Sequence, residues 1–184
     1  LPLFANVPAE SEENDSPAPD TGEVTINLNG DSAECSSDRV SVNGSEITIK
    51  SEGIYKLFGS LNGQVIVAAP KDAKIEIELN GINISCGNGP AIRVDSSNKV
   101  KIVSAGGTDN YLSDGGESEA WVYSKDDITL KGDGKIIING TVKNAVYSKN
   151  TLKITGGTRP KAKCTREEVV ALILRATGKS EGVK

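Results

Sequence analysis

Two segments, VYSKDDITL at residues 122–130 and VYSKNTLKI at residues 146–154, are near copies of each other 24 residues apart. Upstream, VAAPKDAKIEI at 67–77 and IRVDSSNKVKI at 92–102 fit the same pattern, with copy-to-copy spacings of 25 and 30 residues. Each copy has an apolar residue, then a polar turn, then a second short apolar strand. A repeat of roughly 20 to 50 residues made of short β runs is typical of a β-solenoid. The sequence therefore predicts a parallel β-helix with one coil per copy.

Apolar and polar residues alternate along these strands, as they do where one face of a strand is buried. If the copies stack, equivalent positions lie one above the other, and the polar residues between them point outward. The residues predicted to fill the interior are Val65, Val67, Ile75, Ile77, Leu79, Val100, Ile102, Ile128, Leu130, Ile136, Ile138, Leu152 and Ile154.

The two ends of the chain differ from the repeats. Residues 1–22 combine several prolines with Glu, Asp and Ser, which favours a disordered tail or linker. The β-helix is predicted over residues 23–157, followed by a junction and a helix over residues 158–184. In TREEVVALILRATG at 165–178, Thr165 and Glu168 form a capping box. We expect this helix to cover the open end of the β-helix, where strand edges would otherwise be exposed.

Composition excludes several classes of function. The net charge of -4 and pI near 5.0 provide no basic face for a phosphate backbone, so nucleic acid is not an expected partner. The chain has no His, which removes imidazole bases and His-ligated metal sites. No apolar run approaches the roughly 20 residues that a membrane-spanning helix needs, so no membrane insertion is expected. The oligomeric state is left open.

Four stretches carry a resemblance to a known family. They are GIYKLFGSLNGQVIV at 53–67, DAKIEIELNGINI with GPAI between 72 and 92, TDNYLSDGG at 108–116, and VYSKDDITL with GDGKIIING between 122 and 140. Together they resemble the clostridial polysaccharide-lyase-like β-helix proteins that form a carbohydrate-binding domain family. The resemblance implies a single-stranded right-handed parallel β-helix. It also implies an extracellular or cell-surface location and binding of plant-type or acidic polysaccharide, with calcium and without catalysis.

The sequence departs from that family after residue 157, where further coils would be expected. The segment at 165–178 is instead similar to a helix of surface-layer homology repeats, with Glu167 in place of that family's Ala. This similarity raises cell-wall anchoring as an alternative role for the C-terminal segment.

An outward aromatic column is the first candidate site. If Val122 and Val146 face inward, alternation places their neighbours on the outside, where flat aromatic faces can pack against sugar rings. Stacking between coils that merely stabilises the sheet is the alternative. The candidate carbohydrate-binding residues are Trp121, Tyr123, Tyr147, Arg93 and Lys125.

Acidic turns form the second candidate site. Calcium binds six to eight oxygens, and stacked turns can bring carboxylates of adjacent coils together. Acids that are simply solvated are the alternative. The candidate calcium ligands are Asp95, Asp109, Asn110, Asp114, Asp126 and Asp127.

Three functions are compatible with these residues. The first is noncatalytic, calcium-assisted binding of an extracellular polysaccharide, either cellulosic or acidic and pectin-like. The second is a structural spacer or anchoring module of a cell-surface protein. The third is a calcium-dependent lyase, in which an Arg or Lys would remove a proton next to a uronate carboxylate. We expect the first, and therefore no enzymatic activity.

Overall fold

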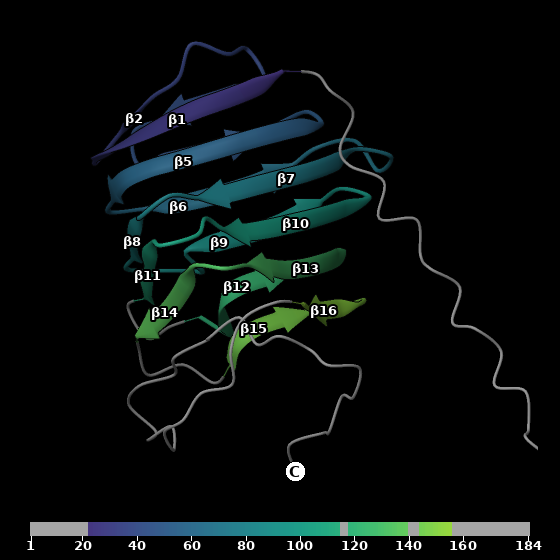
Figure 1. Cartoon of the computed structure of the whole chain (residues 1–184). Helices are drawn as coiled ribbons and strands as arrows, with labels where there is room; N and C mark the ends of the chain where they lie inside the picture. Colours follow the sequence, from purple (N-terminus) through teal and green to yellow (C-terminus); the bar gives the residue numbers. More distant parts are fainter. Residues whose placement is uncertain (1–21, 115–117, 140–143, 156–184) are drawn as a thin grey trace, which may run out of the picture.

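The structure is a computed structural model that describes residues 22–114, 118–139 and 144–155. This part of the chain is an all-β parallel solenoid of about four turns (Figure 1). None of the described residues is helical, so this part holds no helix that could cross a membrane. The predicted C-terminal helix and the predicted N-terminal tail lie outside the described residues.

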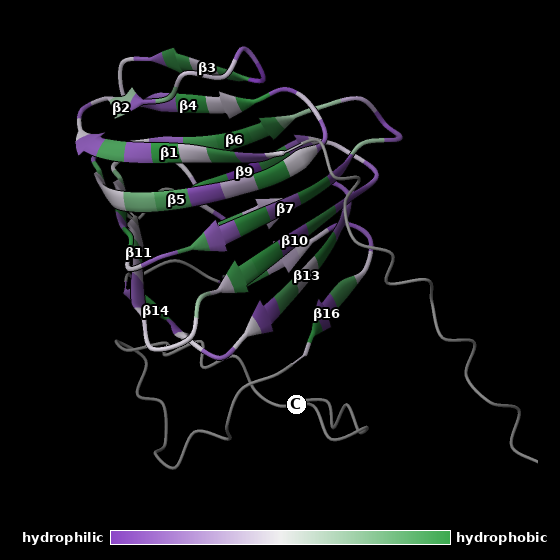
Figure 2. Ribbon diagram, turned by 45° about the horizontal axis from the view of Figure 1, so that its top comes forward, coloured by the Kyte–Doolittle hydropathy of each residue, from purple (hydrophilic) through white to green (hydrophobic). Residues whose placement is uncertain are grey.

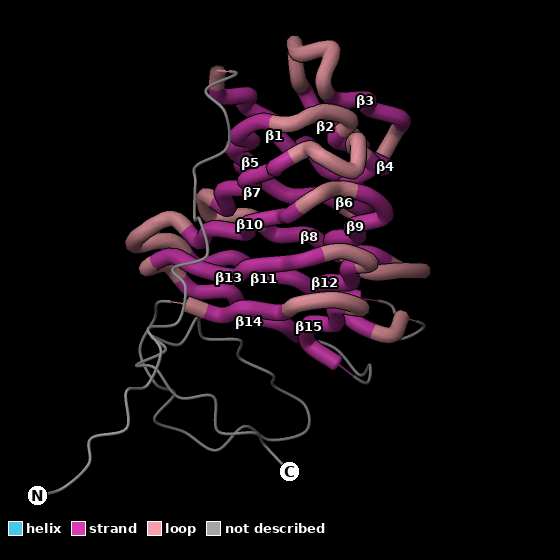
Figure 3. Tube along the Cα trace, turned by 90° about the vertical axis from the view of Figure 1, so that its right-hand side faces the viewer, coloured by secondary structure: helices cyan, strands magenta, loops and turns pink. Residues whose placement is uncertain are grey.

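Each turn of the solenoid contributes strands to three faces, and the strand layers stack with loops between them (Figure 3). The first face holds β1 (Glu23–Gly30), β5 (Gly53–Leu61), β7 (Lys74–Leu79), β10 (Lys99–Ser104), β13 (Asp127–Gly132) and β16 (Leu152–Ile154). The second face holds β8 (Asn83–Cys86), β11 (Asp109–Asp114) and β14 (Lys135–Asn139), which continue from the end of β5. The third face holds β4 (Glu46–Ile49), β6 (Gln64–Ala68), β9 (Ile92–Ser96), β12 (Ala120–Ser124) and β15 (Asn144–Ser148).

Strand β5 belongs to two faces because it bends. Its residues from Gly53 to Leu57 pair with β7, whereas Ser60 and Leu61 pair with β8. Gly59 lies between these parts with φ +87°, and a Cβ there would come within 2.3 Å of the Leu28 carbonyl oxygen. Only glycine fits this close backbone approach, so it allows the chain to turn from one face to the next.

The interior consists of apolar columns, one residue from each coil. Tyr55, Ile77, Ile102 and Leu130 are paired in succession along the first face and are nearly or completely buried. The predicted alignment of the strands that begin near Ile75, Val100, Ile128 and Leu152 is confirmed by the parallel pairing of these residues. Figure 2 shows the resulting alternation of hydrophobic and hydrophilic residues along the strands.

All predicted interior residues are buried except Leu152 and Ile154, which are 40% and 37% exposed. The prediction that these two are buried is wrong, although both lie in the interior columns, paired with Ile128 and Leu130. Their strand, β16, has a neighbouring strand on one side only within the described residues. Ile136 and Ile138 of β14, which also has one neighbouring strand in the described part, are buried nonetheless, so this exposure is particular to β16.

One predicted alignment needs correction. The sequence pattern matched Val67 with Ile92, but Ile92 pairs with Val65, and Val67 pairs with Val94. Because side chains alternate with period 2, this shift of two residues leaves every apolar residue on its predicted face. The periodicity alone therefore does not distinguish the two registers.

Antiparallel strands cover the N-terminal end of the solenoid. Strand β2 (Ala33–Glu34) pairs antiparallel with β1, and β3 (Val40–Asn43) pairs antiparallel with β4. The guanidinium of Arg39 lies over the Tyr55 ring at 5.7 Å, and it donates hydrogen bonds to the carbonyl oxygens of Glu52 and Gly22. The handedness of the coils that the resemblance implies stays a prediction.

We expect Ile77→Ala to lower the free energy of unfolding by about 2 to 5 kcal/mol, because it opens a cavity in a fully buried column. Urea unfolding followed by circular dichroism measures this loss. Glu78→Ala is the control, since Glu78 faces outward on the same strand, and we expect a change below about 1 kcal/mol. Equal losses in the two variants would contradict the assigned orientation of β7.

Candidate functional site

Two tyrosines and an arginine form a column on the outside of the third face. Tyr123 of β12 pairs with Arg93 of β9 on one side and with Tyr147 of β15 on the other. The two phenol rings stack with their centroids 5.6 Å apart and an angle of 13° between their planes. Tyr147 is 37% exposed and Tyr123 is half-buried. The predicted outward column of Arg93, Tyr123 and Tyr147 is therefore confirmed as a structural feature.

A carboxylate joins two cations next to this column. Arg93 Nε donates to Asp95 Oδ2 at 3.0 Å, and Lys125 Nζ lies 2.8 Å from Asp95 Oδ1. We call Arg93, Asp95 and Lys125 the Asp95 cluster. The cluster links β9 to the turn after β12, so it spans two consecutive coils. Two cations share one carboxylate, which leaves the cluster with one net positive charge.

The Asp95 cluster stays ionised at neutral pH. Burial raises the pKa of the Asp95 carboxyl, but the hydrogen bond from Lys125 and the charges of Arg93 and Lys125 outweigh this effect and hold it below its ordinary value. The hydrogen bond to Asp95 raises the pKa of the Lys125 ammonium in turn. Each group thus favours the charged form of the other.

Trp121 does not belong to this outward column. It is 1% exposed and forms part of the hydrophobic core, so the prediction that it faces outward is wrong. Ala120, Trp121 and Val122 are buried in succession at the start of β12. Strict alternation of inward and outward side chains predicted that Trp121 faces outward. The alternation does not hold at the start of β12, where Ala120, Trp121 and Val122 are all buried. The indole Nε1 has no hydrogen-bond partner among the described residues.

Asn110, predicted as a calcium ligand, is instead a buried link between coils. Its Oδ1 accepts hydrogen bonds from the backbone N–H groups of Gly81 and Ile82, at 2.9 and 3.1 Å. Its Nδ2 donates to Thr108 Oγ1 at 2.9 Å and to the Lys135 carbonyl oxygen at 3.0 Å. The side chain is fully buried, and both of its polar atoms are already bonded. Asn110 is therefore not available to an ion at the surface.

Asp126 and Asp127 also bond to the protein itself. The Asp126 carboxylate accepts from Lys71 Nζ at 2.9 Å and from the Ser97 backbone N–H at 3.0 Å. Asp127 Oδ1 accepts from the Thr151 backbone N–H at 3.1 Å. Both carboxylates bond to turns of other coils, so in this structure they hold stacked turns together.

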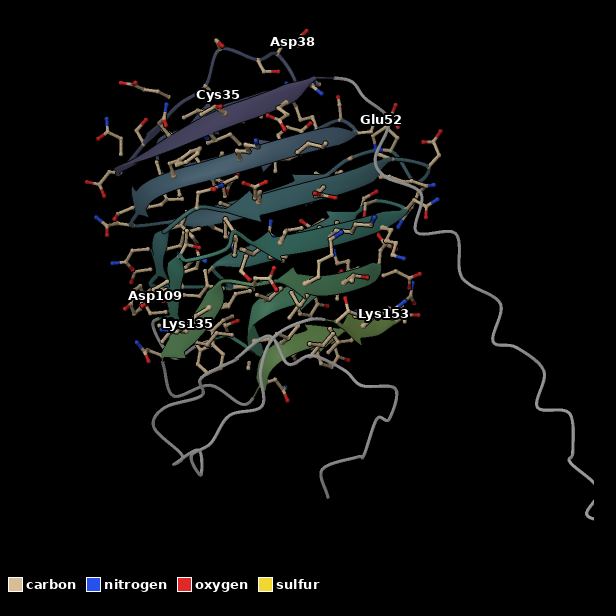
Figure 4. All side chains as sticks on the ribbon, viewed as in Figure 1. Cys35, Asp38, Glu52, Asp109, Lys135 and Lys153 are labelled. Carbon is tan, nitrogen blue, oxygen red and sulfur yellow. The ribbon has the colours of Figure 1, made fainter. Side chains whose placement is uncertain are left out.

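Asp109 forms an ion pair with Lys135 of the next coil, at 3.2 Å (Figure 4). Asp114 ends β11, and its side chain lies outside the described part. Within the described ranges, no three acidic or cysteine side chains gather in a way that could hold a metal ion. The predicted calcium ligands whose side chains are described do not gather at one place, and calcium binding stays a prediction.

The sequence interpretation missed a second exposed tyrosine. Tyr111 is 39% exposed on the second face, in one column with Asn83 and Ile137. The signal was present, because the neighbouring Leu112 is apolar and buried, which puts Tyr111 on the outside. Tyr111 has neither a stacked ring nor a pair of bridged cations among the contacts that the structure describes. It therefore serves as a natural control for the tyrosine column of the third face.

Comparisons with known proteins agree with this fold. A family model for "carbohydrate-binding domain-containing protein" matches residues 43–162. A protein of that name from Acetivibrio thermocellus is 35% identical over 151 residues, which are 74% of this chain and 53% of that protein. A polysaccharide lyase-like protein from C. thermocellum, solved as a gadolinium derivative, matches with a TM-score of 0.70 and 32% identity over 74% of this chain and 60% of that chain. The chain thus spans about half the length of its curated relative, and the family resemblance is confirmed.

We expect Asn110→Ala to lower the free energy of unfolding by roughly 1 to 3 kcal/mol, because it leaves the buried N–H group of Ile82 without an acceptor and removes the bond to Gly81. Thermal or urea unfolding measures this loss. Asn83→Ala changes an exposed asparagine of the same face and should be nearly neutral. If the Asn110→Ala protein were as stable as the parent chain but had lost affinity for calcium, Asn110 would be a calcium ligand and not a structural link.

Stability should decline in acid through Asp95. A carboxyl whose pKa is lowered by folding stabilises the protein above its unfolded pKa, and this contribution is lost as pH falls through the folded pKa, below the ordinary value of 3.8. Lys125→Ala removes one cause of the lowering, so we expect the Asp95 pKa to rise. A carbon-13 NMR titration of the carboxyl group measures the shift. An unchanged midpoint would show that Lys125 does not hold the carboxylate in solution.

Proposed function

This chain belongs to the family of carbohydrate-binding domain-containing proteins, and we propose that it binds an extracellular polysaccharide through the third face of its solenoid without cleaving it. The observation that carries the proposal is the stacked pair of Tyr123 and Tyr147, in register with the Asp95 cluster. Aromatic rings offer apolar surface to the C–H groups of a sugar, and the nearby charged groups offer hydrogen bonds to its oxygens.

The geometry of the column suits an extended chain. Successive coils of a parallel solenoid lie about 4.8 Å apart, so Arg93, Tyr123 and Tyr147 form a row along the solenoid axis. A polysaccharide lying along this row would contact several coils at once. A cellulosic chain would use mainly the phenol rings, whereas an acidic, pectin-like chain would also meet the net positive charge of the Asp95 cluster.

The electrostatics of the site favour binding over catalysis. A lyase needs a basic side chain that gives up its proton easily, and this requires a lowered pKa. Lys125 has the opposite shift, because Asp95 stabilises its protonated form. Arg93 donates to Asp95 through its guanidinium, a group that in proteins acts as a hydrogen-bond donor and not as a proton acceptor. These observations support a noncatalytic role.

The proposal also includes a role for calcium in binding and an extracellular or cell-surface location for the protein. Calcium could bridge the carboxylates of an acidic polysaccharide to exposed acids of the solenoid, such as Asp109, whose side chain is 46% exposed. The location that fits such a ligand is extracellular or attached to the cell surface. Binding assays with calcium and with a chelator test the role of the ion directly.

We expect Tyr123→Ala and Tyr147→Ala to weaken binding to insoluble cellulose and to polygalacturonate by on the order of tenfold, because aromatic contacts are worth about 1 kcal/mol each. Depletion isotherms on cellulose and calorimetric titration with polygalacturonate measure the affinities. Tyr111→Ala is the matched control, since it removes an equally exposed tyrosine from the second face.

The remaining outcomes point to other roles. Equal binding by the double variant and the parent chain would rule out the tyrosine column as the binding surface. If the parent chain binds no polysaccharide in calcium or chelator, a structural spacer or anchoring module becomes the better assignment. Release of unsaturated product that absorbs in the ultraviolet would indicate lyase activity.

A further inference from the structure

Asp95 occupies an irregular position in an otherwise regular ladder. Val94 pairs with Val67 and Ser96 pairs with Ala68, so Asp95 is an extra residue with no partner in β6. Such a bulge redirects a side chain and tends to occur next to functional sites. Here it accompanies a carboxylate that bonds to cations of two consecutive coils, Arg93 and Lys125.

The equivalent position of later coils carries the opposite charge. Lys125 and Lys149 each follow a serine of the paired strands β12 and β15, and their backbone N–H groups donate to the carbonyl oxygens of Val94 and Ser124. The column next to the tyrosines therefore contains Asp95, Lys125 and Lys149 in successive coils. Asp95 is the acidic member of this column, and it lies beside the guanidinium of Arg93.

An anionic ligand at this face must compete with Asp95. Arg93 Nε and Lys125 Nζ already bond to the two oxygens of the Asp95 carboxylate, at 3.0 and 2.8 Å. A sugar carboxylate that approaches these donors is attracted less strongly, because Asp95 already neutralises part of their charge. It is also repelled by the Asp95 carboxylate itself. A neutral sugar carries no charge that Asp95 could repel, so its affinity is little affected.

We propose that Asp95 is a specificity-determining residue of the third face, which limits the binding of anionic polysaccharides relative to neutral ones by holding Arg93 and Lys125 in an internal ion-pair cluster. This inference rests on the proposed polysaccharide-binding function and deepens it. Asp95 itself need not touch the ligand, because it acts through the two cations that it neutralises.

The test compares two affinities, for polygalacturonate and for insoluble cellulose, in the parent chain and in Asp95→Asn. The substitution keeps the shape of the side chain and removes its charge. We expect the ratio of polygalacturonate to cellulose affinity to rise about tenfold or more at low ionic strength, and the gain to shrink as salt is added. Circular dichroism and the melting temperature establish that the variant is folded.

Two further variants separate this role from general effects. Glu78→Gln removes one negative charge from the outward side of β7 on the first face, away from the tyrosine column. It changes the net charge equally, and we expect it to alter the ratio less than about twofold. Asp95→Glu keeps the charge on the third face, and its ratio should stay within about threefold of the parent chain.

An unchanged ratio in Asp95→Asn, with normal binding by the parent chain, would overturn the inference and leave the proposed function intact. An equal rise in Glu78→Gln would also overturn it, because net charge would then account for the effect. If the parent chain binds neither polymer, the proposed function fails first and the inference fails with it.

Discussion

The stacking of coils in parallel register is the constraint on which this structure depends. A single coil cannot bury its apolar residues, so Tyr55, Ile77 and Ile102 become interior only as members of a column. Polar side chains follow the same rule. Asn110 bonds to backbone groups of the coils before and after its own, and Gln64 Nε2 donates to the Pro90 carbonyl oxygen of the next coil at 2.6 Å. The packing between coils therefore determines both the core and the conformation of the turns.

The same constraint builds the candidate site. Because like positions stack, an outward residue of one coil lies over its equivalent in the next, and Tyr123 and Tyr147 become a stacked pair without any special loop. The bulge at Asp95 is a local departure from this regularity, and it lies beside the tyrosine column. Regular stacking provides the row of tyrosines, and the irregular residue modifies the charge beside it.

Much of this organisation could be predicted from the sequence, because the repeats preserve both period and face. The column of Tyr123 and Tyr147 followed from the VYSK copies alone. Trp121 could not be placed correctly, since strict alternation fails where β12 begins. The partner of Ile92 was misassigned because a slip of two residues keeps the same face. Asn110 was assigned to an acidic turn, whereas it lies in strand β11 with its side chain bonded to backbone groups, and an asparagine looks the same in sequence in either setting.

The tyrosine column also determines how such a surface can grow. A duplicated coil would add one more ring to the row and one more layer to each interior column, without disturbing the coils already present. Each added ring would contact a ligand that the other rings already hold nearby, at a high effective concentration. The added contact would therefore multiply the overall affinity. Weak single contacts can thereby give firm retention on an insoluble polymer, and the length of the solenoid, more than the strength of any one contact, becomes the quantity that sets avidity.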